Sequence, residues 1–389
     1  MKAAVYSRDS LEGVKVVTKE MPSKNISQPL SLFRFLFWVL CSVTHFLHKI
    51  LKIKEPPIPI DIQNRKMILC QVKVGGMNPV DAKYLYGDKV PHIFQYFIQG
   101  FLNGCGCGID FSGVVIDAPK GSNFNKGDKI YGTMPPSNGS FSQYILCPSD
   151  FICLKPMNYS YQEAAALPLV GLTALQAFKD LGLKESEHVL ILGASGGTGH
   201  IAVQIARAMG ARVTAVCSDK NIEFVKELDA DDIVIYNDPK VNVIDKLLQI
   251  VNHNKEDGGK SKKFDIVFDS VSSHDMKDNV LRYYERIINA QLIHPRGVYV
   301  NLGGNTIDWF KAHLKRFFYV NIFPRNQELF WVRFPDSSKD LKDLKTMCEC
   351  GKLKVKVGHI FPLTSESVQE AFRLQLSRHV TGKIVIDID

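Results

Sequence analysis

A glycine-rich turn between an apolar strand and an amphipathic helix constrains the fold of this chain more than any other feature. Residues 188–192 (His-Val-Leu-Ile-Leu) are typical of a buried strand, and the turn 193–199 (Gly-Ala-Ser-Gly-Gly-Thr-Gly) follows directly. A helix is expected over 199–209 and a second strand over 212–217. Glycines let the backbone turn tightly and approach an anion, and a helix N-terminus offers free N–H groups. The order of elements therefore predicts a site for the diphosphate of a dinucleotide.

The composition is that of a globular chain. The 389 residues are 45% hydrophobic and 23% charged, which suggests about two or three domains. The net charge is +8, but the basic residues are spread along the sequence, so we expect no nucleic-acid partner. Residues 1–6 are typical of a strand and not of a secretory signal, and the nine cysteines are an odd number. These features predict free thiols in the reducing cytoplasm.

Two kinds of hydrophobic pattern divide the chain. Short strands and turns fill the first part, with strands expected at 68–74, 113–116 and 141–146. After residue 163, helices alternate with nearly continuous apolar strands. The first of these helices is expected over 164–179. This alternation predicts a parallel sheet covered on both faces. The strands expected in that sheet are 188–193, 212–217, 233–236, 264–268 and 298–302.

Residues 30–53 fit neither pattern, because they are dense in large apolar side chains with a narrow polar and basic stripe. The uncharged run between Arg34 and Lys49 is shorter than the roughly 20 residues that a spanning helix needs. A basic stripe beside a broad aromatic face is typical of a helix lying in a membrane interface. A helix packed on the protein and a contact in a homodimer are the alternatives. The membrane hypothesis predicts peripheral attachment to an intracellular membrane or lipid droplet, with an organelle envelope left open.

The residues at the end of the strand 212–217 indicate which dinucleotide the site prefers, because the 2′ position of the dinucleotide's ribose binds there. Sites that prefer NAD usually place an acid there to bind the ribose hydroxyls. Here Asp219 lies just past the strand, flanked by Ser218 and Lys220. A 2′-phosphate is bound by a cation and hydrogen-bond donors. The pattern therefore favours NADPH, with a solvated surface role for Lys220 as the alternative.

A series of short motifs runs along the chain in the order found in one family. They are 78–81 (Asn-Pro-Val-Asp), 110–115 (Asp-Phe-Ser-Gly-Val-Val), 127–129 (Gly-Asp-Lys), 164–168 (Ala-Ala-Ala-Leu-Pro), 171–177 (Gly-Leu-Thr-Ala-Leu-Gln-Ala), 268–271 (Phe-Asp-Ser-Val) and 381–385 (Thr-Gly-Lys-Ile-Val), besides the glycine turn. With these motifs the chain resembles the zinc-independent medium-chain dehydrogenases/reductases of the quinone oxidoreductase type. The resemblance covers most of the chain outside the apolar insertion 30–62.

The resemblance implies an α/β fold with two domains. A GroES-like β domain would comprise residues 1–160 and 345–389, and a Rossmann domain with a doubly wound parallel sheet would comprise 161–344. It also implies hydride transfer from NADPH to quinones or α,β-unsaturated carbonyls without zinc. Relatives are often homodimers, so a homodimer is an open expectation by analogy.

The resemblance also assigns cofactor-binding residues. For the pyrophosphate it implies Ala194, Ser195, Gly196, Gly197 and Thr198; for the 2′-phosphate Ser218, Lys220 and Tyr236; for the nicotinamide Thr173, Val271, Leu302, Gly303 and Lys383. One departure is Asp229, where the family usually has glycine. Because Asp tolerates a left-handed backbone better than most residues, we expect the local turn to survive.

The zinc ligands of zinc-dependent relatives are missing. Those relatives have Cys where Asn78 stands and a His-Glu pair where Ile109 and Asp110 stand, and neither Asn nor Ile replaces such ligands. The pairs Cys105/Cys107 and Cys348/Cys350 offer four thiolates only if the fold brings them together. Free cysteines are the interpretation we favour, so no metal is expected.

Without a metal, hydride transfer needs an electron-poor acceptor and a donor for the resulting oxyanion. The Asn78 amide and the Lys83 charge are the candidate catalytic groups, with Tyr84 and Tyr86 as alternative donors. Asn78 could instead be a turn residue before Pro79 that bonds its own backbone. The alternative function is a catalytically weak NADPH-binding scaffold or interaction protein at a membrane surface.

Overall fold

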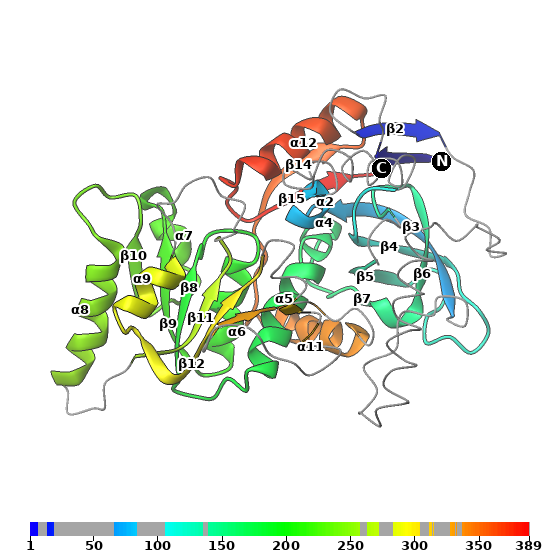
Figure 1. Ribbon diagram of the computed structural model, residues 1–389. Coiled ribbons are helices and arrows are strands. Elements are labelled where there is room, and N and C mark those ends of the chain that lie inside the picture. Colours follow the sequence, from blue (N-terminus) through cyan, green and yellow to red (C-terminus); the bar gives the residue numbers. More distant parts are fainter. Residues whose placement is uncertain are drawn as a thin grey trace. The chain divides into compact units, whose positions relative to one another are not determined.

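The structure is a computed structural model, and it divides into two compact units. It describes residues 1–6, 14–18, 66–83, 106–134, 139–256, 263–271, 283–303, 311–312, 314, 327–330, 332 and 337–388. Unit 1 comprises Met1–Leu169, Arg333–Glu349 and Val357–Asp389, and unit 2 comprises Val170–Val332 and Cys350–Lys356. The chain thus begins unit 1, builds unit 2 and returns to unit 1, as the colours of Figure 1 show.

Unit 1 is built on a mainly antiparallel sheet with the order β14-β15-β3-β4-β5-β7, and β6 also pairs with β3. Its strands are β3 (Met67–Gly76), β4 (Asp110–Asp117), β5 (Lys129–Thr133), β6 (Tyr144–Pro148), β7 (Ile152–Leu154), β14 (Val357–Pro362) and β15 (Lys383–Asp387). A separate antiparallel pair is formed by β1 (Lys2–Tyr6) and β2 (Val14–Thr18). The register pairs Val385 on β15 with Gly76 on β3, so the C-terminal strand lies beside an early one.

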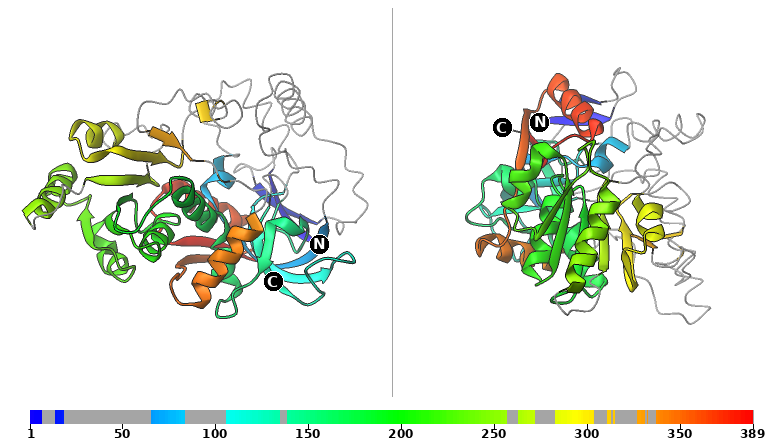
Figure 2. Two further views of the ribbon diagram at one scale, coloured as in Figure 1. Left: turned by 90° about the horizontal axis from the view of Figure 1, so that it is seen from below. Right: turned by 90° about the vertical axis from the view of Figure 1, so that its left-hand side faces the viewer.

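Short helices cover this sheet. They are α2 (Pro79–Lys83), α4 (Tyr161–Ala165), α11 (Ser337–Glu349), α12 (Ser365–Ser377) and the 3₁₀ helix η1 (Ser149–Phe151). Helix α12 lies over β2, where Gln369 Nε2 donates to the Val14 carbonyl at 2.9 Å (Figure 2). Beneath it, Phe372 joins Phe111 and Ile384 of the sheet in one buried apolar core. Burying this apolar face is what stabilises unit 1.

Unit 2 is a six-stranded sheet in the order β10-β9-β8-β11-β12-β13, and every pair is parallel. The strands are β8 (His188–Leu192), β9 (Arg212–Cys217), β10 (Asp232–Ile235), β11 (Phe264–Asp269), β12 (Ile293–Asn301) and β13 (Gln327–Leu329). The helices are α5 (Pro168–Asp180), α6 (Gly199–Ala208), η2 (Asp219–Asn221), α7 (Ile222–Lys226), α8 (Val243–Glu256) and α9 (Tyr283–Asn289). This strand order is that of a doubly wound dinucleotide-binding sheet.

The continuous helix expected over 164–179 is wrong. Helix α4 ends at Ala165 and α5 begins at Pro168. Proline has no N–H and clashes with the preceding turn, so it suits the first position of a new helix and not the interior of an old one. Ser160 caps α4, accepting from the Glu163 N–H while the Glu163 carboxylate accepts from the Ser160 N–H.

Several expectations fall outside the described residues. They concern the insertion 30–62, Tyr84, Tyr86 and Cys105. In the part of the chain that the structure describes, no helix has both the length and the apolar content needed to cross a bilayer.

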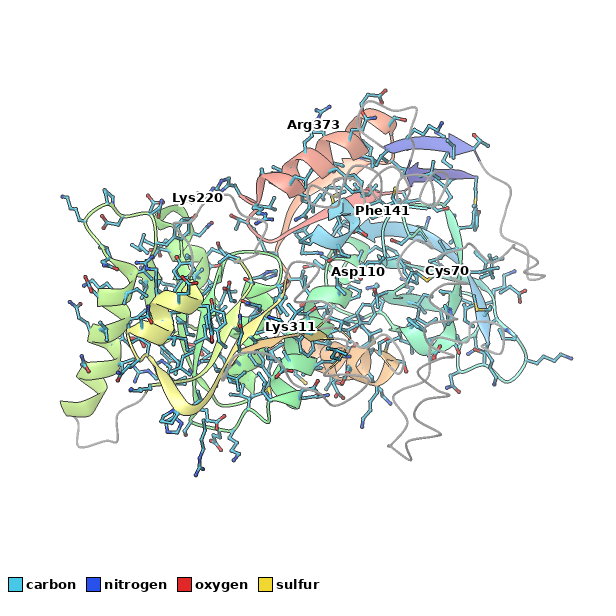
Figure 3. All side chains as sticks on the ribbon, viewed as in Figure 1. Cys70, Asp110, Phe141, Lys220, Lys311 and Arg373 are labelled. Carbon is cyan, nitrogen blue, oxygen red and sulfur yellow. The ribbon has the colours of Figure 1, made fainter. Side chains whose placement is uncertain are left out.

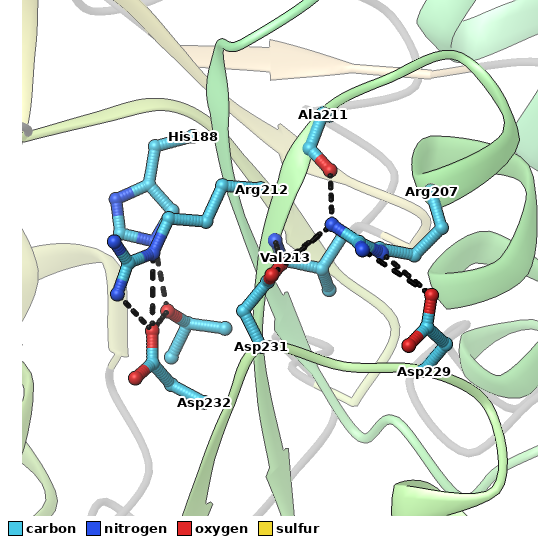
Figure 4. Close-up of polar contacts among 9 residues, drawn as sticks. His188, Arg207, Ala211, Arg212, Val213, Asp229, Asp231 and Asp232 are labelled. Carbon is cyan, nitrogen blue, oxygen red and sulfur yellow. Dashed lines mark hydrogen bonds and ion pairs between the residues drawn. The ribbon is translucent and has the colours of Figure 1, made fainter.

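A cluster of ion pairs joins the amino ends of β9 and β10 to α6 (Figure 4). Arg207 Nη1 donates to both oxygens of Asp231 at 2.8 and 3.1 Å, and Asp231 also accepts from the Val213 N–H at 2.7 Å. Asp229 has the left-handed φ of 64° expected for it. Its carboxylate lies 3.2 Å from Arg207 Nη2 but is 82% exposed, against 31% for Asp231.

This difference in exposure separates two otherwise similar substitutions. Asp231→Asn should lower the free energy of unfolding by about 1–2 kcal/mol, because it removes the charge from the contact between Asp231 and Arg207 Nη1. Asp229→Asn should cost less than about 0.5 kcal/mol, since exposed ion pairs contribute little and Asn keeps the left-handed backbone. Urea denaturation of both variants measures the two costs. Equal losses would contradict the prediction that Asp231 contributes more to stability than Asp229.

Candidate functional site

The glycine turn lies between β8 and α6 and needs glycine at two positions. Gly193 has a φ of 80°, and a Cβ on it would stand 2.3 Å from Cγ1 of Val271. A Cβ on Gly199 would stand only 2.0 Å from the Gly193 carbonyl oxygen. Both residues therefore allow the helix to begin close against the end of the strand.

The turn fits a diphosphate. Within the described residues, the N–H groups of Ser195, Gly197 and Thr198 have no hydrogen-bond partner. Among the described residues, a Cβ on Gly196 would meet only the Gly193 carbonyl oxygen, at 3.3 Å, so these residues leave the space beside it open. Free N–H groups at the start of a helix are the donors that anions bind.

The turn is held from its own helix. His200 is fully buried, and its Nδ1 lies 2.8 Å from the Gly196 carbonyl, while its Nε2 lies 3.2 Å from the Lys356 nitrogen. Because the second contact needs an acceptor nitrogen, Nδ1 carries the proton and donates to Gly196. The histidine therefore ties the turn to the returning segment of unit 2.

The residues predicted around the cofactor follow the carboxyl ends of neighbouring strands in unit 2. Ser218 and Lys220 follow β9, Tyr236 follows β10, Val271 follows β11, and Leu302 and Gly303 follow β12. Thr173 lies on α5 and is nearly buried. Ligands of open parallel sheets bind at this edge. The structure thus groups the strand-end residues along one edge, and their contacts with a cofactor stay predictions.

An amide links the turn to the end of β9. Asn221 is 8% exposed, and its Nδ2 donates to the hydroxyls of Ser195 at 3.0 Å and Ser218 at 2.9 Å. Sequence reasoning missed Asn221, since a short polar residue in a 3₁₀ turn has no pattern of its own. Its two hydrogen bonds connect Ser195, predicted at the pyrophosphate, to Ser218, predicted at the 2′-phosphate.

Unit 1 contains a buried polar cluster formed by residues far apart in the sequence. Lys383 is 3% exposed, and its Nζ donates to the Asn78 Oδ1 at 2.6 Å and the Met77 carbonyl at 2.5 Å. The Asn78 Nδ2 donates to Asp110 Oδ2 at 2.9 Å. The Asn78 N–H donates to Asp81 Oδ2 at 2.8 Å. We call Asn78, Asp81, Asp110 and Lys383 the buried cluster.

Burial dominates the electrostatics of the buried cluster. It raises the pKa of Asp81 to about 8, against the lowering effect of the Asn78 N–H bond. Burial also raises the pKa of Asp110, although Lys383 and the Asn78 amide oppose it. The pKa of Lys383 is lowered by burial and raised by the two carboxyl groups. A protonated Asp81 leaves one ammonium and one carboxylate, which is the neutral arrangement a dry interior favours.

Asn78 has a fixed amide orientation. Its oxygen accepts from Lys383 and one N–H donates to Asp110, while the other N–H has only a long contact of 3.4 Å with the Gly76 carbonyl. Lys83, predicted beside it, is the last residue of α2, and its side chain lies outside the description. Sequence reasoning placed Lys383 near the cofactor and missed its bond to Asn78, because no local pattern joins residues so far apart.

Comparisons with known proteins find similarity to dehydrogenases and oxidoreductases. The zinc-binding dehydrogenase family matches residues 228–386. The mitochondrial NAD(P)H oxidoreductase RTN4IP1 of Homo sapiens is 25% identical over 92% of this chain and 86% of its own length. The chloroplast envelope quinone oxidoreductase homolog of Arabidopsis thaliana is 27% identical over 85% of this chain and 92% of its own. The chain thus resembles the quinone oxidoreductase-like medium-chain dehydrogenases/reductases.

The fold is confirmed by comparison with solved structures. The quinone oxidoreductase from Coxiella burnetii superposes with a TM-score of 0.69, at 24% identity, covering 100% of this chain and 99% of that one. Unit 1 is accordingly the GroES-like β domain and unit 2 the Rossmann domain. Among the described residues, no group of three or more His, Cys, Asp or Glu side chains could hold a metal ion.

Asp81 should make the stability of the protein depend on pH. Its pKa is about 8 when folded against 3.8 when exposed, so the folded protein holds an extra proton between these values. The contribution of Asp81 to stability is then highest below pH 3.8 and falls by up to about 1.4 kcal/mol per pH unit as the pH rises toward 8. Asp81→Asn, which keeps the acceptor for the Asn78 N–H, should remove this fall.

Urea denaturation across this pH range measures the effect. Asp128→Asn is the matched control, because the Asp128 carboxylate also accepts an N–H three residues back, from Asn125 at 2.7 Å, in a hydrogen bond that is exposed and not buried. A gap between Asp81→Asn and the wild type that does not change with pH would refute the raised pKa.

Proposed function

We propose that this chain is an NADPH-dependent oxidoreductase that reduces quinones or α,β-unsaturated carbonyls by hydride transfer without zinc. Similarity to NAD(P)H oxidoreductases supports NAD(P)H-linked oxidoreduction. The preference for NADPH and the identity of the acceptor are the finer parts of the proposal. The observation that carries it is the set of free N–H groups in the glycine turn, at the carboxyl edge of a doubly wound sheet.

The Rossmann unit would hold the cofactor by its phosphates. The N–H groups of Ser195, Gly197 and Thr198 would bind the diphosphate, and Lys220 would approach the 2′-phosphate. When bound, the reduced nicotinamide supplies the hydride. Thr173, Val271, Leu302 and Gly303 are proposed to line its ring.

In the GroES-like unit, Asn78 is proposed to stabilise the oxyanion that hydride addition produces. Lys383 and Asp110 fix both ends of its amide, so the loosely held N–H is the one left for a reacting oxygen. This role requires the acceptor's oxygen to replace the Gly76 carbonyl. Preorganised donors of this kind are worth more in a dry site than in water.

The same contacts support chemistry without zinc. The position at which zinc-dependent relatives have a cysteine ligand is taken here by an amide already bound to Lys383. An ammonium 2.6 Å from that amide would repel a metal cation. An electron-poor quinone or enone does not need the Lewis acid that an aldehyde or ketone needs when it is reduced to an alcohol.

Substitution of Asn78 tests the proposal. Asn78→Ala should lower kcat on a good quinone or enone by about 100-fold, the usual cost of losing one oxyanion donor, while the Kd for NADPH stays unchanged. Asn158→Ala is the control, because the Asn158 amide donates to the Cys348 carbonyl in the same unit, outside the buried cluster. Thermal melts and stopped-flow NADPH oxidation measure folding and rate.

Three results would count against the proposal. NADPH oxidation absent over a full panel of quinones and enones would reject the activity. NADPH binding with negligible turnover in the wild type would favour the scaffold function. An Asn78→Ala variant that is folded and fully active would remove Asn78 from the mechanism.

We also propose peripheral membrane contact through residues 30–53, supported by their aromatic content and basic stripe. Deletion of residues 31–53 should move the protein from the membrane pellet to the supernatant in cell fractionation, with NADPH binding retained as a check on folding. An unchanged distribution would leave packing on the protein or a homodimer contact, and sedimentation velocity of the deletion variant distinguishes these two.

A further inference from the structure

A buried amide oxygen without a hydrogen-bond partner lies at the carboxyl end of β12. Asn301 is the last residue of that strand and is 7% exposed. Its Oδ1 is buried and accepts no hydrogen bond from the part of the chain that the structure describes. Because a buried acceptor left unbound destabilises a folded protein, such an atom points to a ligand that supplies the missing donor.

The polar groups nearest to Asn301 are bound to one another. The register pairs Asn301 with Asp269 on β11. Asp269 accepts from the Val271 N–H with Oδ1, at 3.0 Å, and from the Tyr299 hydroxyl with Oδ2, at 2.5 Å. On the other side, the Phe330 N–H donates to the backbone carbonyl of Asn301 at 2.9 Å. The described residues of the two neighbouring strands therefore leave the side-chain oxygen of Asn301 without a donor.

The face of the sheet on which Asn301 lies connects it to the glycine turn. Tyr299 and Asn301 share one face of β12, because side chains alternate along a strand. Tyr299 belongs to a buried apolar cluster against which Val271 packs. Val271 also lies next to Gly193, where a Cβ would stand 2.3 Å from the Val271 Cγ1. This face therefore leads from Asn301 through Val271 to the glycine turn.

The strand order indicates which half of a dinucleotide would reach Asn301. With the diphosphate at the turn after β8, one half would extend over β9 and β10 and the other over β11 and β12. Residues predicted at the 2′-phosphate follow β9 and β10, among them Lys220, whose exposed side chain extends outward (Figure 3). Val271 and Leu302, predicted at the nicotinamide, follow β11 and β12. The nicotinamide half would thus lie on the side of Asn301.

We propose that Asn301 binds the carboxamide of the nicotinamide, with its Oδ1 accepting a hydrogen bond from the carboxamide N–H₂ group. This inference rests on the proposed NADPH-dependent function and adds a cofactor-binding residue to it. The polar substituent of the nicotinamide ring is a primary amide, whose N–H donors are what the buried oxygen lacks. A polar contact at this substituent would also restrict rotation of the ring, so that its reactive carbon meets the acceptor in one orientation.

Binding of oxidised cofactors tests the inference without turnover. The 3-acetylpyridine analogue of NADP⁺ has a methyl group in place of the carboxamide N–H₂ and cannot donate to Asn301. In calorimetry, wild-type protein should bind NADP⁺ about tenfold more tightly than this analogue, the size expected for losing the donor to a buried acceptor. Asn301→Leu should bind the two within about twofold, because leucine accepts a hydrogen bond from neither.

Two further measurements separate cofactor binding from a structural role. Adenosine 2′,5′-bisphosphate, which lacks the nicotinamide, should bind wild-type protein and Asn301→Leu equally. Without cofactor, Asn301→Leu should melt at or above the wild-type temperature, because leucine removes a buried acceptor that has no partner.

Thr214→Val is the control variant. It removes a buried hydroxyl of the same sheet, bound to His188 at the start of β8, which is the opposite end of the strands from Asn301. The ratio of the Kd for the analogue to the Kd for NADP⁺ should therefore keep its wild-type value in Thr214→Val.

The possible failures are distinguishable. If wild-type protein binds NADP⁺ and the analogue equally, the inference is overturned even where Asn301→Leu does not fold. A folded Asn301→Leu that keeps the wild-type ratio overturns it too, and so does equal weakening of all three ligands, as a purely structural role would give. Wild-type protein that binds neither NADP⁺ nor the bisphosphate overturns the proposed function itself.

Discussion

The close approach of helix α6 to strand β8 is the contact on which the cofactor region depends. Gly199 lies so near the Gly193 carbonyl that a Cβ would stand 2.0 Å from that oxygen. This approach places the free N–H groups of the turn at the carboxyl edge of the sheet, beside the residues that follow β9 and β11. His200 and Asn221 then fix the turn from two sides. Backbone geometry, more than side-chain chemistry, makes this edge suitable for an anion.

The buried cluster of the GroES-like unit is formed by charged side chains and not by the geometry of the backbone. One ammonium and two carboxyl groups share a space with almost no exposed surface. They are tolerated because the Asn78 amide lies between them, accepting from the cation and donating to an anion. Removing one partner from such a set leaves another charge buried without compensation. The Rossmann unit thus has free N–H donors in its glycine turn, whereas the donors of the buried cluster in the GroES-like unit are bonded within the cluster.

Local signals predicted more of the fold than of the site. The glycine turn, the strands of the parallel sheet and the left-handed Asp229 could be predicted, because each depends on neighbours in the sequence. The break at Pro168 was missed although proline carries a strong signal, since the apolar spacing continues through it. The bond between Lys383 and Asn78 could not be predicted from spacing, because it exists only where β15 pairs with β3.

The path of the chain through the two units orders their assembly. Strand β15 pairs with β3 and carries Lys383, yet all of the Rossmann unit is synthesised between them. On the ribosome, the Rossmann unit can therefore complete its sheet before residues 74–76 of β3 gain their partner strand β15 and before Asn78 gains its cation. Nascent chains should be most dependent on chaperones in this interval, because unpaired strand edges aggregate.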